Sequence, residues 1–155
     1  MSNATKIAIV DDEKDMRQSI SQWLALSGYD TETFASAEEA LKAIGPDYPG
    51  IVISDIKMPG MDGIQFLKKL MGNDSTLPVI MITGHGDMPM AVEAMRVGAF
   101  DFLEKPFEDV DLFKAVERAI EKDTKARKLE MAKQEIHHKV YSLTAREHEV
   151  LTYVI

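Results

Sequence analysis

The sequence predicts an α/β fold, a doubly wound five-stranded parallel sheet with helices on both faces. Short apolar, β-branched runs alternate five times with segments of helical periodicity, and the connections between them are short. Several of these runs are apolar along their whole length rather than at alternate positions. That pattern is typical of parallel strands that are buried on both faces.

Five segments are expected to form the strands: residues 6–10, 30–34, 51–55, 78–83 and 99–104. The second is more polar than the others, which favours a place at an edge of the sheet. The third stops at a carboxylate and passes into a Pro/Gly turn, as expected of a buried strand bounded by turn signals.

Caps and apolar stripes indicate the helices between the strands. Ser36 and Glu39 have capping-box spacing and begin the second helix. Asp62 and Asp87 are expected to cap the third and fourth helices. The first helix is expected to end at Gly28 and to pack through Met16, Ile20, Trp23, Leu24 and Ser27.

The last helix begins near Glu108 and is expected to extend well beyond the sheet. Farther along the chain Leu129, Ile136 and Leu143 recur at seven-residue spacing among alternating Lys and Glu. This spacing fits a helical linker over residues 123–141. Either a short coiled coil or a solvated single helix is compatible with it.

A second domain is expected to begin after the linker. Thr144 and Glu147 again have capping-box spacing, and the helix that they begin is cut off at Ile155. The expected organisation is therefore one domain over residues 5–122, the linker over 123–141, and a truncated start of another domain over 142–155.

The composition excludes several classes of protein. The formal net charge of −8 argues against DNA binding through the bulk field of this segment, and the absence of cysteine excludes disulfides and thiolate metal sites. No apolar run is long enough to span a membrane and no secretory signal is evident, so we expect a cytoplasmic protein. The acidity is compatible with a carboxylate site for a divalent cation and equally with plain solubility.

Polar side chains follow four of the predicted strands, and the carboxyl ends of parallel strands lie along one edge of a sheet. The residues expected to converge there are Asp11, Asp12, Asp55, Thr83 and Lys105. A hard cation such as Mg²⁺ would relieve the repulsion among the three carboxylates. Asp55 would then serve as a nucleophile toward phosphorus, while the ammonium and the hydroxyl neutralise the oxygens of the transferred group.

Each residue also has an ordinary structural explanation. The acidic pair favours the N-terminal end of a helix through its dipole, Lys105 suits a surface position, and Thr83 suits a strand end. The functional interpretation is favoured because these residues occur together, in this order, at successive strand ends.

Four motifs in register resemble the receiver domain of bacterial two-component response regulators: Asp11-Asp12-Glu13, Asp55 with Met58-Pro59-Gly60-Met61-Asp62-Gly63, Thr83-Gly84, and Lys105-Pro106-Phe107. The resemblance covers about residues 5–122. It implies a flavodoxin-like sheet of strand order 2-1-3-4-5. It also implies that Asp55 accepts a phosphoryl group from a phosphohistidine on a sensor histidine kinase. Such a domain is not an enzyme, although it phosphorylates itself with Mg²⁺ and slowly loses the group again.

The resemblance also implies roles for the other residues. Asp12, Asp55 and the backbone carbonyl of Lys57 would ligate Mg²⁺, with Asp11 acting largely through water, and the Lys105–Pro106 bond would be cis. Thr83 and Phe102 would form a switch that alters the face made by the fourth helix, the fifth strand and the last helix. That face and the linker helix are the expected homodimer contacts.

Residues 83–95 and 101–107 are similar to the FixJ and DctD types of regulator, whose outputs differ. Residues 143–151 look like the opening helix of a LuxR-type helix-turn-helix. We therefore expect a FixJ-like transcription factor that binds DNA through an output domain missing from this segment, with a DctD-like sigma-54 activator as the alternative.

There are three rival interpretations, and the main one comes from another class of protein. A haloacid-dehalogenase-type phosphatase would need a second aspartate two residues after the nucleophile, where this chain has Lys57. A binding module that works without phosphorylation would not need the acidic pair, Thr83 and Lys105. A stand-alone receiver would not need the helix that begins after Ser142.

Overall fold

The computed structural model describes residues 5–45, 48–72, 76–84 and 86–123. Five strands form one sheet in the order β2-β1-β3-β4-β5, and every neighbouring pair is parallel. The strands are β1 (Lys6–Val10), β2 (Asp30–Phe34), β3 (Gly50–Asp55), β4 (Val79–Thr83) and β5 (Asp101–Glu104). The predicted fold class, strand order and edge position of the polar second strand are confirmed.

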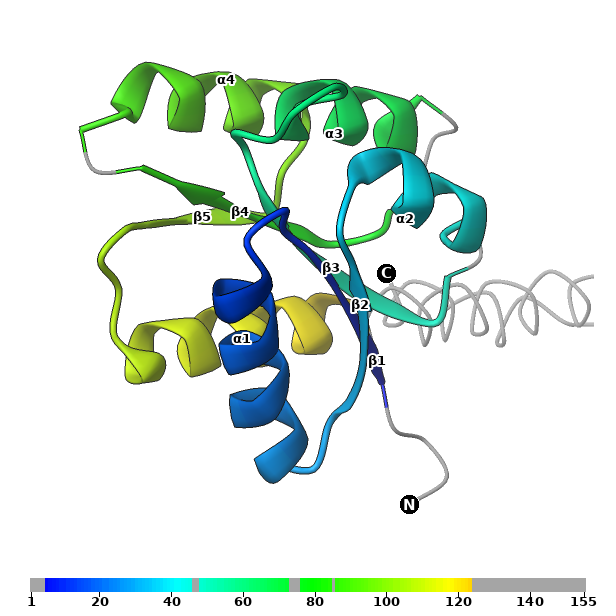
Figure 1. Ribbon diagram of the computed structural model, residues 1–155, viewed down its shortest axis with the longest axis vertical. Helices are drawn as coiled ribbons and strands as arrows, with labels where there is room; N and C mark the ends of the chain where they lie inside the picture. The colour runs from blue at the N-terminus through cyan, green and yellow to red at the C-terminus, as the bar shows by residue number, and fades with distance from the viewer. Residues whose placement is uncertain (1–4, 46–47, 73–75, 85, 124–155) are drawn as a thin grey trace, which may run out of the picture. The chain divides into compact units, whose positions relative to one another are not determined.

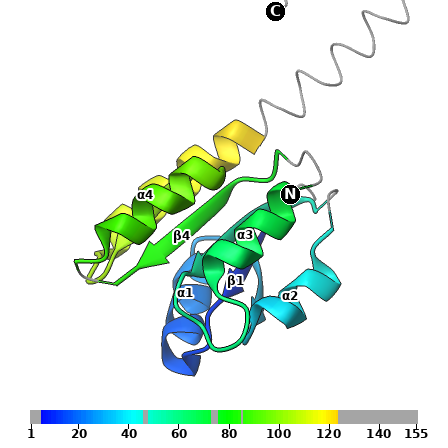
Figure 2. The same cartoon turned by 90° about the horizontal axis from the view of Figure 1, so that it is seen from above.

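Helices cover both faces of this sheet (Figure 1). Those on one face are α2 (Ala37–Ala43), α3 (Gly63–Met71) and α4 (Met88–Val97). The other face carries α1 (Lys14–Leu26) and a helix that starts at residue 109 and continues to 123, the last described residue. Seen from above, α3 and α4 lie side by side (Figure 2).

The alternation of side chains along the strands gives each face its own hydrophobic core. Ala8, Val52 and Met81 point toward α2, α3 and α4, where Phe66 is fully buried. Ile9 and Ile53 point toward α1 and the helix over residues 109–123, which we call the C-terminal helix. Because both faces are buried, the central strands are mainly apolar, as their sequences indicated, and their polar residues lie at the strand ends.

The predicted packing stripe of α1 is partly wrong. Ile20 and Leu24 are buried, one turn apart, and their row packs on the sheet. Trp23 is 38% exposed and Ser27 forms the exposed C-cap, so neither belongs to the packed face.

The fifth strand begins two residues later than predicted. Gly98 adopts φ +131 and the backbone N–H groups of Gly98 and Ala99 both donate to the carbonyl of Ala94. These residues therefore complete the end of α4, and β5 starts only at Asp101.

Three of the predicted caps lie within the described residues, and two of these are confirmed. The Ser36 side chain accepts from the N–H of Glu39, and the Asp62 side chain accepts from the N–H of Gln65 in a complete capping box. Asp87 does lie at the N-cap position of α4, but its side chain accepts no hydrogen bond from that helix, so the expected side-chain cap is wrong.

No helix among the described residues is long and apolar enough to cross a membrane. The predicted linker beyond Asp123 and the expected start of a second domain lie outside the described residues.

Gly63 allows α3 to begin directly beneath the end of β3. Its N–H donates to the carbonyl of Ile56 at 2.7 Å, which closes the loop that follows Asp55. A Cβ at this position would lie 2.6 Å from Ile56 Cα and 2.7 Å from Met81 Cε, closer than such atoms can approach. The glycine of the predicted motif is therefore required for close packing of the backbone.

We expect Gly63→Ala to lower the free energy of unfolding by about 2 kcal/mol or more, because the added methyl group forces the loop and α3 apart. Urea denaturation followed by circular dichroism measures the change. Gly45→Ala is the control, since a Cβ at that position meets no atom within 4 Å. Equal stability of the two variants would contradict the packing argument.

Candidate functional site

The predicted site residues meet at the carboxyl edge of the sheet. The parallel register pairs Val10 with Ser54 and Thr83 with Glu104, so the residues just beyond these strand ends come together. Asp11, Asp55 and Thr83 are 1%, 5% and 1% exposed, respectively. The site therefore lies at strand ends, with Asp11, Asp55 and Thr83 shielded from water, whereas Asp12 is exposed.

Three carboxylates form the acidic part of the site. Asp11, Asp12 and Asp55 each offer an oxygen, and these atoms all lie within 4.8 Å of one another. One oxygen of Asp11, Oδ1, accepts from the N–H of Glu13 at 2.9 Å. The other, Oδ2, is buried without a hydrogen-bond partner. A buried carboxylate oxygen without a partner, next to two further carboxylates, suits a hard cation such as Mg²⁺.

Lys105 brings a positive charge from the opposite side. Its Nζ lies 3.4 Å from Asp55 Oδ2 and 3.7 Å from Glu13 Oε1. The backbone N–H of Lys105 donates to the carbonyl of Thr83 at 2.8 Å, and the Lys105–Pro106 peptide bond is cis, as the resemblance implied. The ammonium is therefore directed at the carboxylate that was predicted to react.

The electrostatics of the cluster follow from burial and like charge. Burial, reinforced by the nearby charge of Asp55, raises the pKa of Asp11 to about 6. Burial also raises the pKa of Asp55, although Lys105 and backbone hydrogen bonds from Lys57 and Ile56 oppose the change. Burial would by itself lower the pKa of Lys105, but Asp55 and Asp11 outweigh it and raise that pKa. The cluster therefore favours binding of positive charge.

The two predicted switch residues are neighbours of the site rather than partners of Asp55. The Thr83 hydroxyl donates to the carbonyl of Leu103 at 3.5 Å, toward β5. Phe102 is half-buried against the core beneath α2, α3 and α4, opposite Met81 in the sheet. Lys57 lies in the loop directly after β3, with its side chain 76% exposed.

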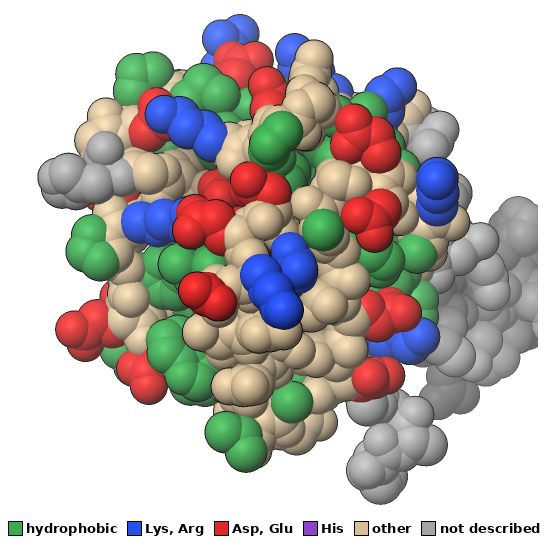
Figure 3. Space-filling model, in the orientation of Figure 1, with side chains coloured by type: hydrophobic (Ala, Val, Ile, Leu, Met, Phe, Trp, Pro, Cys, Tyr) green, Lys and Arg blue, Asp and Glu red, His purple; other side chains and the backbone are tan. Residues whose placement is uncertain are grey.

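Contacts that the sequence did not indicate complete the surroundings. Arg17 donates to the carbonyl of Asp11 at 2.7 Å and so holds the loop between β1 and α1. Glu104 accepts from the N–H of Gly86 at 2.8 Å, which ties the loop after β4 to β5. Neither contact leaves a signal in the sequence, because each pairs a side chain with a backbone group. Elsewhere, acidic and basic side chains are interspersed on the face seen in Figure 3.

We expect Asp11→Asn to stabilise the metal-free protein at neutral pH. Since the pKa of Asp11 lies above its ordinary value, the folded state binds that proton more tightly than the unfolded chain does. The stabilisation of the folded state by this bound proton is therefore complete below about pH 4 and is lost as the pH rises through about 6. At pH 7.5 in EDTA the free energy of unfolding of the variant should exceed that of the wild-type chain by about 1 to 3 kcal/mol, because each pKa unit corresponds to about 1.36 kcal/mol.

Urea denaturation from pH 4 to 8 measures this difference, with the exposed Asp109→Asn as the control. Excess Mg²⁺ should then stabilise the wild-type chain more than Asp11→Asn. An unchanged slope of stability against pH in Asp11→Asn would show that Asp11 is not the titrating group.

Known proteins share this architecture and sequence. The family described as response regulator receiver domain matches residues 7–117. The C4-dicarboxylate transport transcriptional regulatory protein DctD of Rhizobium meliloti is 48% identical over 122 residues, which cover 79% of this chain and 26% of that protein. The transcriptional regulatory protein FixJ of Bradyrhizobium diazoefficiens is 42% identical over 151 residues, covering 97% of this chain and 74% of that protein.

Solved structures agree with these relatives. Full-length FixJ from B. japonicum superimposes with a TM-score of 0.74 at 43% identity, covering 96% of this chain and 73% of that one. The response regulator StyR has a TM-score of 0.81 at 34% identity, and the match covers 97% of this chain and 76% of that one. The chain thus spans about a quarter of the DctD relative and about three quarters of FixJ. The chain belongs to the response regulator receiver domain family and is homologous to the FixJ and DctD regulators of two-component systems.

Proposed function

We propose that Asp55 is the phosphoacceptor and that it takes a phosphoryl group from a phosphohistidine of a sensor histidine kinase. The observation that carries this proposal is the surroundings of its carboxylate. Asp55 is 5% exposed at the end of β3, has Lys105 Nζ at 3.4 Å, and shares a cluster with Asp11 and Asp12. In the transfer, the carboxylate oxygen bonds to phosphorus as the phosphorus–nitrogen bond of the histidine breaks.

We assign Mg²⁺ as the cofactor of this site. Asp12, Asp55 and the backbone carbonyl of Lys57 would hold it directly and Asp11 largely through water. When bound, the ion neutralises the carboxylates and the oxygens of the phosphoryl group. Lys105 pairs with one phosphoryl oxygen and the hydroxyl of Thr83 donates to another. The unpartnered Oδ2 of Asp11 supports the presence of a cation here.

Thr83 and Phe102 form the switch in this proposal. To reach the phosphoryl group, the Thr83 hydroxyl leaves the carbonyl of Leu103, and Phe102 turns inward from its half-buried position. Phosphorylation then biases an equilibrium between two existing arrangements rather than creating a new one.

The output of the switch is a homodimer formed through α4, β5, the C-terminal helix and the linker. Met88, Val92 and Met95 support this proposal because they lie on one side of α4, at spacings of four and three residues. Their side chains are 51%, 55% and 41% exposed, respectively, which is unusual for apolar residues of this size.

The output domain is proposed to be of the LuxR type, so that the whole protein is a cytoplasmic transcription factor that binds DNA. The match to FixJ supports this, because it extends over 151 residues, whereas the match to DctD covers 122. A DctD-like sigma-54 activator is the second candidate. A phosphatase is disfavoured by Lys57, which replaces the acid/base aspartate that such enzymes need. The chain therefore carries and slowly loses a phosphoryl group without turning over a substrate.

Intact mass after incubation with acetyl phosphate tests the phosphoacceptor. We expect a gain of one phosphoryl group that requires Mg²⁺ and is abolished in Asp55→Asn, because no other carboxylate of the cluster faces Lys105 within hydrogen-bond distance. Asp109→Asn should label like the wild-type chain.

Two outcomes would contradict this assignment. No gain by the folded protein under any condition would favour a binding module that works without phosphorylation. Steady release of phosphate without accumulation of the adduct would favour a phosphatase.

Substitution of Val92 tests the dimer face. Val92→Asp should weaken dimerisation of the phosphorylated chain at least about tenfold, since it places a charge in an apolar contact. Phosphorylation itself should be unchanged, because Val92 lies outside the site. Sedimentation velocity of phosphorylated samples measures the dimer, and Leu26→Asp on α1, where Leu26 is 87% exposed, is the matched control. If both variants dimerise like the wild-type chain, the dimer forms through another surface.

A further inference from the structure

We propose that the ion pair between Lys57 and Asp87 is a latch that holds the loop after the phosphoacceptor to the start of α4. In this latched state Asp87 is kept from capping α4, and release of the pair allows it to do so. The latch adds a regulatory contact to the proposed phosphoacceptor site, and its role in regulation rests on the proposed function. The ion pair and the cap are testable without phosphorylation.

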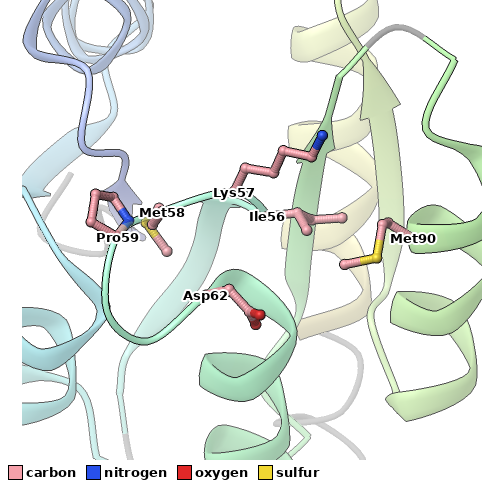
Figure 4. Close-up of a pocket in the computed structure, with 6 residues that line it drawn as sticks. All are labelled: Ile56, Lys57, Met58, Pro59, Asp62 and Met90. Carbon is pink, nitrogen blue, oxygen red and sulfur yellow. The ribbon is translucent and has the colours of Figure 1, made fainter.

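The pair links the loop after β3 to the residue at the start of α4. Lys57 Nζ lies 3.4 Å from Asp87 Oδ2. Between the loop and α4 is an open surface hollow of about 390 Å³, with Ile56 and Lys57 on the loop side, Met90 on the α4 side and Asp62 below (Figure 4). Since side chains do not fill this space, the start of α4 can adjust relative to the loop even though Ala91 and Ala94, farther along the helix, are buried in the core.

Asp87 occupies the N-cap position of α4 without acting as a cap. Its φ and ψ are −97 and 47, and its side chain accepts no hydrogen bond from the helix. Within the part of the chain that the structure describes, its Oδ2 is buried without a hydrogen-bond partner, and the charge paired with it is the ammonium of Lys57. Pro89 has no N–H, which leaves the N–H of Met90 as the group that an aspartate cap would bind.

Asp62 shows what the same residue type does when it is not held elsewhere. At the start of α3, the ψ of Asp62 is 175 and its side chain accepts from the N–H of Gln65 at 2.8 Å. Asp87 would need a similar extended backbone to cap α4, and that rotation carries its carboxylate away from Lys57. Because the ion pair occurs with ψ of 47 at Asp87 and the cap of Asp62 with ψ of 175, ion pair and cap belong to different backbone conformations and are alternatives.

The two alternatives are close in free energy. An ion pair with one exposed partner and a helix cap make contributions of similar, small size. The side chain of Lys57 is 76% exposed and that of Asp87 is 20% exposed, so solvent weakens the pair. A small change in the loop therefore suffices to convert one arrangement into the other, which is the property of a switch.

The latch lies where phosphorylation would act on it. Lys57 follows Asp55 by two residues, and two described residues of the segment before α4, Gly86 and Asp87, are tied to the surroundings of the site. Asp87 is tied by its ion pair, and Gly86 by its N–H, which donates to Glu104 beside Lys105. Rearrangement of the loop around a phosphorylated Asp55 would move Lys57 and release Asp87 to cap α4.

Amide hydrogen exchange of the unphosphorylated full chain, measured by NMR, tests the proposal at Met90. Lys57→Gln removes the latch and leaves Asp87 free to cap. Asp87→Asn also removes the ion pair but retains a good capping side chain, whereas Asp87→Ala removes both. Lys69→Gln on α3 is the matched control for the loss of one positive charge.

We expect the Met90 amide to exchange about fivefold more slowly in Lys57→Gln and Asp87→Asn than in the wild-type chain, which is about 1 kcal/mol at 1.4 kcal/mol per factor of ten. In Asp87→Ala it should exchange at least as fast as in the wild-type chain, and in Lys69→Gln it should be unchanged. Wild-type exchange in both Lys57→Gln and Asp87→Asn, or identical behaviour of Asp87→Asn and Asp87→Ala, would overturn the latch. Failure of Asp55 to accept a phosphoryl group would overturn the proposed function and leave this result standing.

Discussion

Repulsion among buried carboxylates is the constraint on which the rest of this structure depends. Asp11 and Asp55 lie almost completely shielded from water, with Asp12 beside them. Among the described residues, the ammonium paired with this cluster is that of Lys105, which directly follows β5. Such a cluster is unfavourable until a cation enters, so the fold must hold it in place by other means. Burial raises the pKa of both Asp11 and Asp55, and the charge of Asp55 adds to the effect at Asp11.

The sheet supplies the necessary rigidity. Each face carries its own apolar core, and the central strands are buried from end to end. The groups that form the cluster therefore extend from backbones that cannot move apart without disrupting a core. Gly63 and Arg17 then fix two of the loops that leave the carboxyl edge, one by allowing close approach and the other by a hydrogen bond.

The start of α4 is less firmly held than its middle, where Ala91 and Ala94 are buried. Its first turn lacks a side-chain cap, an open hollow lies between it and the loop after β3, and the helix presents three exposed apolar side chains. A helix start with few fixed contacts is suited to respond to a chemical change nearby. The same features that make α4 adjustable make it the natural route from the carboxylate cluster to a partner chain.

The sequence by itself determined the elements, their order, and the residues that meet at the carboxyl edge. Those features depend on local patterns, such as apolar runs, caps and polar residues at strand ends, which are visible without knowledge of distant contacts. The resemblance to receiver domains added the strand order and the cis bond before Pro106.

Only the tertiary structure decided which partner each polar group takes. Asp87 has a capping position but pairs with Lys57, the hydroxyl of Thr83 donates toward β5, and Trp23 remains largely outside the core. In each of these cases a local preference competes with a group that is distant in sequence or with the packing of the sheet. The outcome depends on distances and burial, which exist only once the chain has folded.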